Sequence, residues 1–194
     1  MAIYIPNRNA LILLPAKCGS SWLRKACTNL SEQVIFLGPR ELRGHGGLEF
    51  YGRNFDQIAA FIRHPFEWHV SYWNYRTYVK SFWEPERAPV DRDCGMRPFD
   101  DYIKCVYSNY PNRVSDYFAR FIGETGNRID FIGKLEHLNE DFSKLAIAWD
   151  LGLDQRAHDL TPINKQTKKY FDPSLSELVY ESEKHLYLEF GYSA

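Results

Sequence analysis

The sequence lacks the long apolar run that a membrane-spanning helix needs. Its longest continuous apolar stretch runs only from Ala10 to Leu14, whereas a span takes about 20 residues. The N-terminus also lacks a basic region followed by an extended apolar core, which is the pattern of a secretory leader. We therefore expect a chain that is neither secreted nor anchored in a membrane.

An excess of charge of one sign is missing as well. Lys and Arg number 24 against 25 Asp and Glu, a formal net charge of −1. Without an overall basic field, duplex nucleic acid and anionic membranes are disfavoured as partners. Any site for an anion has to be built locally, from a few residues.

Cysteine is scarce, with four in the chain. Cys18, Cys27, Cys94 and Cys105 include no Cys-x-x-Cys pair and no histidine at zinc-finger spacing. Reduced thiols in a cytoplasm are the simplest interpretation, and no metal site is expected.

The composition is otherwise that of a globular protein, with 44% hydrophobic and 25% charged residues. A chain of 194 residues has the length of one domain and can bury a full hydrophobic core without disulfides or metal ions to stabilise it. We expect a single domain over residues 1–194.

The order of apolar patterns predicts an α/β fold. Short apolar runs that end at turn residues predict buried strands over residues 9–14, 34–37, 58–62 and 129–133. Apolar residues at helical spacing predict helices over residues 22–30, 65–79, 99–107, 114–122, 139–151 and 171–192. Loops are expected over residues 40–54 and 80–98. Strands that alternate with helices favour three layers, a mostly parallel sheet flanked by helices.

The turn after the first predicted strand has the composition of an anion site. The strand leads into Lys17, Cys18 and Gly19, and Ser20 and Ser21 then open a helix. Backbone N–H groups and the positive end of the helix dipole converge there, and the lysine adds a full charge. Because the lysine precedes the glycine, this is not a Walker A loop. Phosphate is the natural ligand; a helix start with serine caps and an exposed lysine is the ordinary alternative.

Cys18 and Arg24 also form the Cys-x5-Arg spacing by which phosphatase loops wrap a phosphate around a thiolate. A helix N-terminus lowers the pKa of a cysteine, as that chemistry requires. Against this, Trp22 and Leu23 are bulky where such a loop needs inward-facing amides. A phosphatase is therefore kept as an alternative hypothesis.

A second anion site is predicted after the third strand. Arg63 follows residues 58–62 at the carboxyl edge, where open α/β sheets bind ligands. Ser71 lies eight residues further on, in the next helix, where its hydroxyl can share an anion with Arg63. Two such sites at neighbouring strand ends suit a ligand with phosphates at both ends. The ordinary alternative is an ion pair between Arg63 and a carboxylate such as Glu67.

Together, these segments resemble the nucleotide-binding motifs of sulfotransferases. The run from Lys17 to Leu23 (Lys-Cys-Gly-Ser-Ser-Trp-Leu) is similar to their 5′-phosphosulfate loop, and Arg-His-Pro-Phe-Glu from Arg63, followed by Ser71, is similar to their 3′-phosphate motif. Residues 133–142 and 171–192 resemble later elements of the family. One departure is Ala16, which separates Pro15 from the lysine where many members have Pro-Lys.

The resemblance implies a P-loop-kinase-like sulfotransferase fold that uses 3′-phosphoadenosine-5′-phosphosulfate (PAPS) and releases 3′-phosphoadenosine-5′-phosphate (PAP), without a metal. The wording of the second motif is closer to the carbohydrate-type enzymes, so the expected acceptor is a saccharide hydroxyl, with a small molecule as the other option. The residues that the resemblance assigns to the donor are Lys17, Cys18, Gly19, Ser20, Ser21, Trp22, Arg63 and Ser71.

A hydroxyl acceptor needs its proton removed, a task that suits histidine. Among the six histidines, we expect His45 as the catalytic base beside Lys17, because it lies in the glycine-rich loop and the family's base often precedes the 3′-phosphate strand. Glu49 is the reserve. A nucleotide-binding protein without catalysis is a third hypothesis.

Aromatic residues are abundant, at 16% of the chain, and eight of them lie between Phe66 and Trp83. They are too many for one buried helix face, so part of the group is expected to contact the acceptor, the adenine or another subunit. Positive charge also gathers between residues 76 and 97, which suits an anionic saccharide, although a solvated surface is the ordinary alternative. The residues that carry it are Arg76, Lys80, Arg87, Arg92 and Arg97.

Overall fold

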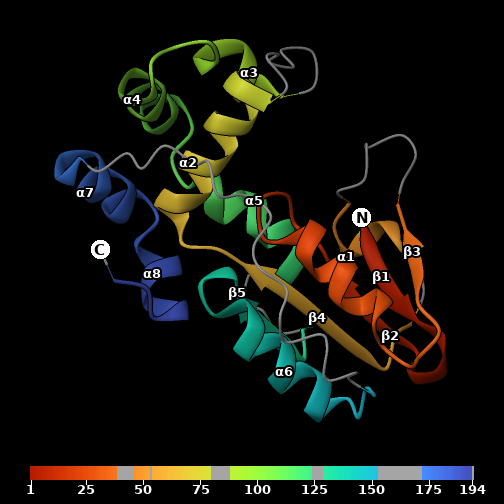
Figure 1. Cartoon of the computed structure of the whole chain (residues 1–194). Helices are drawn as coiled ribbons and strands as arrows, with labels where there is room; N and C mark the ends of the chain where they lie inside the picture. The colour runs from red at the N-terminus through yellow and green to blue at the C-terminus, as the bar shows by residue number, and fades with distance from the viewer. Residues whose placement is uncertain (39–45, 53, 80–87, 124–128, 153–171, 194) are drawn as a thin grey trace. The chain divides into compact units, whose positions relative to one another are not determined.

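The computed structural model describes residues 1–38, 46–52, 54–79, 88–123, 129–152 and 172–193 (Figure 1). The chain divides into two compact units. Unit 1 comprises Met1–Arg63 and Phe118–Lys165, and unit 2 comprises His64–Tyr117 and Gln166–Ala194. Unit 1 contains a β-sheet flanked by helices, whereas the described part of unit 2 is helical. The expected α/β class is confirmed.

The sheet has five strands in the order β3-β1-β2-β4-β5. β2 (Ala10–Leu13), β4 (Gln57–Ile62) and β5 (Phe131–Lys134) run parallel. β1 (Ala2–Ile5) runs antiparallel to both β2 and β3 (Ile35–Leu37). The sheet is therefore mixed: β1 runs opposite to the other four strands, which share one direction. The link from β1 to β2 is the single 3-10 turn η1 (Pro6–Arg8), which is far too short for a parallel crossover.

Two strands differ from the sequence prediction. β1 is missing from it, since a run of four residues carries little periodic signal. β3 is predicted to be buried, yet it is an edge strand in which Ile35 and Phe36 are each 38% exposed. An apolar run therefore identifies the strand here without locating it in the sheet.

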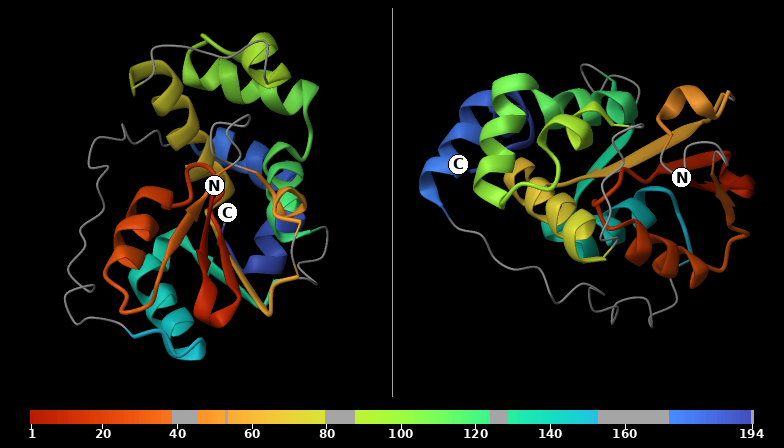
Figure 2. Two further views of the ribbon diagram at one scale, coloured as in Figure 1. Left: turned by 90° about the vertical axis from the view of Figure 1, so that its right-hand side faces the viewer. Right: turned by 90° about the horizontal axis from the view of Figure 1, so that it is seen from above.

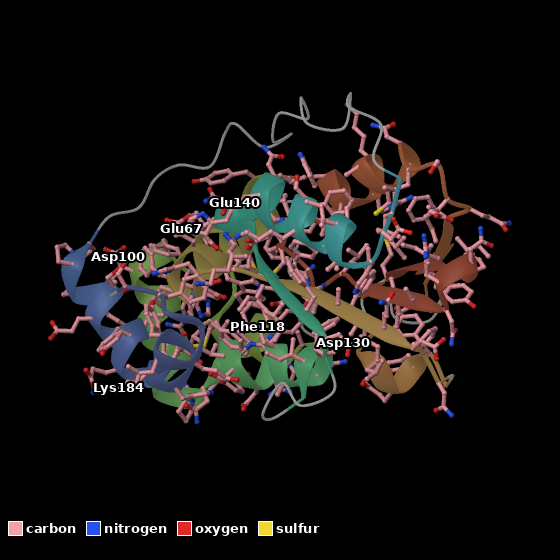
Figure 3. The ribbon with its side chains drawn as sticks, turned by 90° about the horizontal axis from the view of Figure 1, so that it is seen from below. Glu67, Asp100, Phe118, Asp130, Glu140 and Lys184 are labelled. Carbon is pink, nitrogen blue, oxygen red and sulfur yellow. A yellow bond between two sulfur atoms is a disulfide. The ribbon has the colours of Figure 1, made fainter. Side chains whose placement is uncertain are left out.

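Helices α1 (Ser20–Thr28) and α6 (Leu138–Ala148) cover one face of the sheet (Figure 2). The last turns of α5 (Arg113–Ile122) lie on the opposite face, where Phe118 and Phe121 are each 1% exposed (Figures 2 and 3). The core beneath α1 and α6 takes alternate residues of three strands, as a pleated sheet requires. Its members include Ile3, Ile5, Ile12, Phe61, Trp22, Leu23, Phe142 and Leu145.

Two carboxylates hold β5 in place beside β4. The side chain of Asp130, labelled in Figure 3, accepts the Ile58 N–H at 2.6 Å, and that of Asp141 accepts the Lys134 N–H at 2.8 Å. The second bond also joins β5 to α6 across the 3-10 turn η5 (Leu135–His137). The carboxyl end of β5 is thereby aligned with that of β4.

The helices of unit 2 depart from prediction at three points. The helix predicted over 65–79 is α2 (Pro65–Asn74) followed by a π-helical turn, η4 (Tyr75–Val79). Part of the predicted loop over 80–98 is α3 (Pro89–Cys94), and the terminal helix divides at Glu183 into two. The remaining helices are α4 (Phe99–Asn109), α7 (Pro173–Ser182) and α8 (Lys184–Phe190).

Helix α2 is buried on nearly its whole circumference, and this accounts for its aromatic residues. Nine of its ten residues are buried, with Glu67 the exception. Trp68 stacks on Tyr72 with ring centroids 5.0 Å apart, and the Trp73 indole donates to the Arg97 carbonyl at 2.9 Å. Burial of α2 on nearly all sides therefore accounts for several of the eight aromatic residues between Phe66 and Trp83, including Trp68 and Trp73.

A buried polar network holds α5, α7 and α8 together. Glu183 is fully buried between α7 and α8, and its carboxylate accepts the N–H groups of Val114 (2.7 Å) and Ser115 (3.0 Å) and the Ser115 hydroxyl. It thus caps the N-terminus of α5. Burial raises the pKa of Glu183, while these hydrogen bonds oppose the shift. The break between α7 and α8 brings this carboxylate into the core.

His69 extends the same network. The Tyr107 hydroxyl donates to Glu183 at 3.0 Å and lies 2.8 Å from Nε2 of His69, while the Tyr102 hydroxyl lies 3.3 Å from Nδ1. Since the Tyr107 proton goes to the carboxylate, Nε2 carries the proton of a neutral imidazole and Nδ1 accepts from Tyr102.

This neutral histidine predicts an acid-sensitive fold. Burial, and secondly the charge of Arg113, lower the pKa of His69 to about 3. The unfolded chain gains a proton there near pH 6.5, so stability present above that pH is lost as the pH falls toward 3, by about 1.4 kcal/mol per pH unit. We expect His69→Gln to remove this slope between pH 6.5 and 5 in urea unfolding. His185→Gln, at an exposed site on α8, should retain it, and equal slopes in both variants would contradict the assignment.

The expectation of four reduced thiols is wrong. Cys94 of α3 and Cys105 of α4 form a disulfide, with their Cα atoms 5.6 Å apart, whereas Cys18 and Cys27 are free and buried. The sequence does not indicate this bond, because the two cysteines come together only when α3 packs against α4. Disulfides persist mainly in oxidising compartments, so the cysteines no longer support a cytoplasmic location. In the described ranges, no helix has the length and apolar character to cross a membrane.

Reduction should destabilise unit 2. The bond closes a loop of 11 residues, for which chain entropy predicts about 3 kcal/mol of stabilisation. We expect a phosphine reductant to lower the melting temperature of the wild-type chain and to leave a Cys94→Ser/Cys105→Ser variant unaffected. Thiol titration in denaturant is the check, because four free thiols before reduction would rule the bond out.

Candidate functional site

Three positively charged residues follow the three parallel strands at one edge of the sheet. Lys17 comes after β2, Arg63 follows β4, and Lys134 ends β5. Since β2, β4 and β5 are adjacent and parallel, their carboxyl ends meet at this edge. Nη1 of Arg63 donates to the Lys17 carbonyl at 3.4 Å. The structure therefore brings together two basic residues of unit 1 that belong to separate predicted motifs.

The loop between β2 and α1 has an unusual backbone. Lys17 has φ = 68° and Gly19 has φ = 83°, both in the left-handed region. Lysine rarely adopts this conformation, which costs about 1–3 kcal/mol and is typical of functional loops. A Cβ on Gly19 would lie 2.8 Å from a Leu135 methyl group and 3.1 Å from one of Leu138. Glycine is needed here for its left-handed φ and because the loop packs closely on the start of α6.

The start of α1 presents amides to the same region. The first hydrogen bond of the helix runs from the Leu23 N–H to the Gly19 carbonyl at 2.9 Å, so the amides of Ser20 and Ser21 precede the intrahelical ladder. Ser20 is half-buried and Ser21 is exposed. The first turn has no acidic residue to compete with an anion. The backbone and the helix dipole therefore favour an anion at the start of α1. The part that Lys17 plays in binding it stays a prediction.

Two residues assigned to the donor have side chains in the core. Trp22 is 5% exposed, and its ring meets Phe142 edge-on at 5.5 Å. Cys18 is 1% exposed, with Sγ directed at the Ala16 carbonyl at 3.6 Å. These two side chains pack in the core beneath the loop, so they are not available to bind a ligand. At these two positions only the backbone could do so.

The surroundings of Cys18 disfavour the thiolate form that a nucleophilic cysteine needs. Burial raises its pKa, which outweighs the opposing effect of the neighbouring charges of Arg63 and Lys17. Arg24 is exposed on α1, with its guanidinium 4.9 Å from the centroid of the Phe36 ring. A Cys-x5-Arg phosphatase needs the opposite, a thiolate with its arginine turned toward it.

Residues of the second motif beyond Arg63 belong to unit 2. Ser71 is 7% exposed within α2. His64 contacts its own unit, with Nε2 3.0 Å from the Ser193 carbonyl and its ring edge-on to Tyr187 and Tyr192. A shared anion site of Arg63 and Ser71 stays a prediction.

Of the two candidate bases, His45 lies outside the described residues. Glu49 is exposed in the 3-10 turn η3 (Leu48–Phe50). Burial, and secondly the charge of Glu49, raise the pKa of Tyr51 to about 12. A Cβ at Gly47 would collide with this carboxylate and with the Arg120 carbonyl, so the segment packs against the end of α5.

Sequence reasoning does not assign a role to the residues after β5. Glu136 and His137 are exposed in η5, next to Lys134 at the same sheet edge. The Glu136 carboxylate is close enough to Cys18 to raise the pKa of its thiol, opposing Lys17 and Arg63. The signal that could have found these residues is their position after a third parallel strand.

The basic group predicted between residues 76 and 97 is largely neutralised. Arg76 pairs with the buried carboxylate of Asp91 at 3.2 Å, and Arg92 pairs with Asp93 at 2.7 Å. Asp91 also accepts the Tyr72 hydroxyl at 2.7 Å. Lys80 and Arg87 lie outside the described residues. The described members of the group therefore act mainly in structure rather than as an open anion site.

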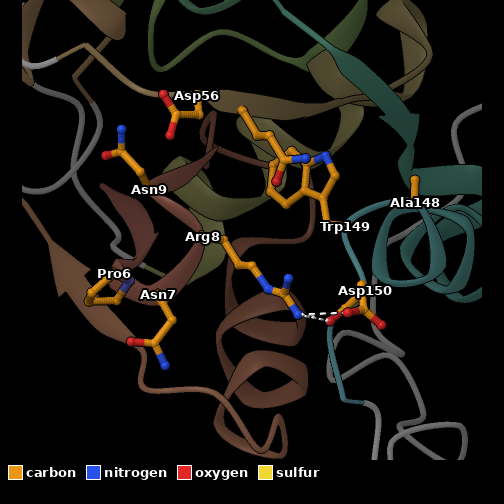
Figure 4. Close-up of a pocket in the computed structure, with 9 residues that line it drawn as sticks. Pro6, Asn7, Arg8, Asn9, Asp56, Ala148, Trp149 and Asp150 are labelled. Atoms are coloured by element: carbon orange, nitrogen blue, oxygen red, sulfur yellow. Dashed lines mark hydrogen bonds and ion pairs between the residues drawn. The ribbon is translucent and has the colours of Figure 1, made fainter.

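A cavity of about 570 Å³ lies at the amino ends of β2 and β4, the opposite edge from Lys17 (Figure 4). Arg8 stands in it, donating to the Asp150 carbonyl at 2.6 Å and pairing with its carboxylate at 2.9 Å. These bonds tie the turn before β2 to the end of α6, so the arginine is already engaged. In the described part of the chain, no three His, Cys, Asp or Glu side chains gather as metal ligands.

Comparison of the chain with protein-family models, with curated proteins and with solved structures found no match. The resemblance to sulfotransferases is therefore carried by the two motifs themselves.

The buried thiol predicts that Cys18 is unreactive. At pH 8, we expect iodoacetamide to leave Cys18 and Cys27 unmodified in the folded protein and to label both in urea, as measured by peptide mass spectrometry. Cys27 is the internal control, because it is equally buried but lies on the helix away from the loop. Rapid labelling of Cys18 alone at neutral pH would restore the phosphatase hypothesis.

Proposed function

We propose that the protein is a PAPS-dependent sulfotransferase that transfers a sulfuryl group to a hydroxyl acceptor, expected to be a saccharide. The observation that carries this proposal is the contact between Arg63 and the Lys17 carbonyl at the carboxyl edge of the sheet. It unites the two motifs on which the resemblance rests.

The arrangement suits a nucleotide with anionic groups at two places. Lys17, with the amides and hydroxyls of Ser20 and Ser21, would hold the 5′-phosphosulfate. The Arg63 guanidinium would bind the 3′-phosphate, with Ser71 as the predicted second donor. Lys17, Arg63 and Lys134 place three positively charged residues at the ends of adjacent parallel strands, and Glu136 adds one carboxylate just after β5.

The residues present can assist an in-line transfer. The bond from sulfur to the bridging phosphate oxygen breaks while a bond from the acceptor oxygen to sulfur forms. The Lys17 ammonium stabilises the charge that develops on the leaving phosphate. The acceptor's proton passes to a base, for which His45 is the proposed residue.

Loss of either basic residue should weaken nucleotide binding. We expect Lys17→Ala and Arg63→Ala each to weaken PAP binding about tenfold or more in calorimetry, because each removes a charged hydrogen-bond donor. Lys17→Ala should also reduce transfer from labelled PAPS by about a hundredfold, corresponding to about 3 kcal/mol.

Lys144→Ala and Arg120→Ala are the matched controls. Both residues are exposed on helices of unit 1, and each change removes the same charge as its counterpart. Wild-type protein that fails to bind PAP would overturn the proposal. PAP binding without transfer to any of a panel of glycans and phenols would leave the non-catalytic nucleotide-binding protein.

Loss of the base should separate transfer from binding. We expect His45→Ala to abolish transfer at neutral pH while PAP affinity stays within about twofold of the wild type, because the base contacts the acceptor rather than the nucleotide. Glu49→Gln is the comparison. Full turnover by the histidine variant, together with an inactive glutamate variant, would move the role to Glu49.

A further inference from the structure

We infer that a groove between α1 and the edge strand β3 binds an acidic oligosaccharide, one that carries carboxylate or sulfate groups. The groove has a volume of about 270 Å³ and is lined by residues of unit 1 alone. Its lining residues are Ser21, Arg24, Lys25, Thr28 and Phe36.

Helical geometry puts four of these residues on one face of α1. Ser21, Arg24, Lys25 and Thr28 follow the i, i+3, i+4, i+7 spacing of a single helix face, and all four are exposed. The buried residues of α1 occupy the intervening positions and face the core. A row of polar and basic side chains therefore runs along the outside of the helix.

The groove concentrates positive charge without a counter-charge. Arg24 and Lys25 line it, and neither its lining nor α1 contains a carboxylate. Among the residues that the structure describes, no acidic side chain forms an ion pair with either cation, whereas Arg8, Arg76 and Lys144 are each paired. Two cations that lack an acidic partner among the described residues form a local site for an anion, although the net charge of the chain is −1.

Arg24 is held in an orientation that suits carboxylate or sulfate. Its guanidinium carbon lies 4.9 Å from the centroid of the Phe36 ring, a cation–π arrangement that restrains the side chain. The planar fork of a guanidinium binds two oxygens of one acidic group, which an ammonium does not do. Arg24 thus supplies directional recognition, and Lys25 supplies an adaptable charge.

The remaining lining favours a sugar over a nucleic acid. Ser21 offers a hydroxyl, and Thr28, whose hydroxyl already donates to the Lys25 carbonyl at 2.7 Å, offers an acceptor oxygen. Phe36 is 38% exposed and adds apolar surface for the face of a sugar ring. Single-stranded nucleic acids need several aromatic platforms for their bases, and the lining of this groove contains one ring.

The groove adjoins the loop that the proposed function assigns to the donor. Ser21 belongs both to that loop and to the groove lining. The choice of a saccharide rests on the proposed function, whereas the preference for an anion rests on Arg24 and Lys25. The inference assigns Arg24 to binding an acidic group on a sugar, whereas the phosphatase hypothesis assigns it to a phosphate held beside Cys18.

The test is equilibrium binding of a fluorescent heparin-derived hexasaccharide to the full chain, measured by anisotropy without any nucleotide. We expect Arg24→Gln/Lys25→Gln to weaken binding about tenfold or more. The matched control, Arg120→Gln/Lys144→Gln, removes the same two charges from exposed sites on α5 and α6 and should change affinity by less than about twofold. Arg24→Lys, which keeps the charge but loses the fork, should fall between the two. A neutral chitin hexasaccharide should not bind.

Several outcomes would overturn the inference. Equal weakening by both double variants would mean that overall charge, not the groove, attracts the sugar. Equally tight binding of oligo-dT or polyglutamate would assign the groove to a nucleic acid or an acidic peptide. PAP binding is measured in parallel: PAP binding with no hexasaccharide binding overturns the groove and leaves the proposed function. Groove-dependent hexasaccharide binding without PAP binding supports the groove and contradicts the proposed function.

Discussion

The candidate site depends on the parallel pairing of β2 with β4. Leu13 lies opposite Ala60 in this register, so the chain leaves both strands at the same edge of the sheet. Lys17 and Arg63 then meet although 46 residues separate them. The apolar side chains that bury β2 completely thus also decide which basic residues become neighbours. A change in the strand order would separate the two motifs even if each kept its local structure.

The loop after β2 combines a strained backbone with rigid support. Lys17 is held in the left-handed region, which persists only where the surroundings over-determine the conformation. Gly19 packs on Leu135 and Leu138, and Trp22 anchors the helix in the core. Burial raises the pKa of the Cys18 thiol, so the groups that the loop offers to an anion are backbone amides, serine hydroxyls and the Lys17 ammonium.

Charge in this protein is balanced overall but distributed unevenly. Arg8, Arg76 and Arg92 are paired with carboxylates, and in unit 2 the buried Glu183 is satisfied by hydrogen bonds to α5 and Tyr107. On the outer face of α1, Arg24 and Lys25 form no ion pair with any residue that the structure describes. A net charge near zero therefore says little about anion binding, since paired and unpaired cations count equally in it.

Local patterns in the sequence determined most of the elements and the two anion motifs. The helical segment predicted over residues 171–192 begins after Asp172, whose carboxylate accepts the Ser174 N–H at 2.9 Å, and ends at Gly191, with φ = 61°. These features depend on neighbours within a few residues, so they can be read from the chain directly.

Tertiary structure decided what those elements touch. It set β1 antiparallel to its two neighbours, left Phe36 on an edge strand, buried Trp68 and Trp73 of α2, and joined Cys94 to Cys105. It also turned Cys18 into the core and Arg24 away from it, which separates two residues that sequence spacing had linked. Each of these outcomes depends on which surfaces pack together over long sequence separations. Sequence periodicity shows which residues are apolar and where a helix begins. It does not show which distant residue each side chain will contact.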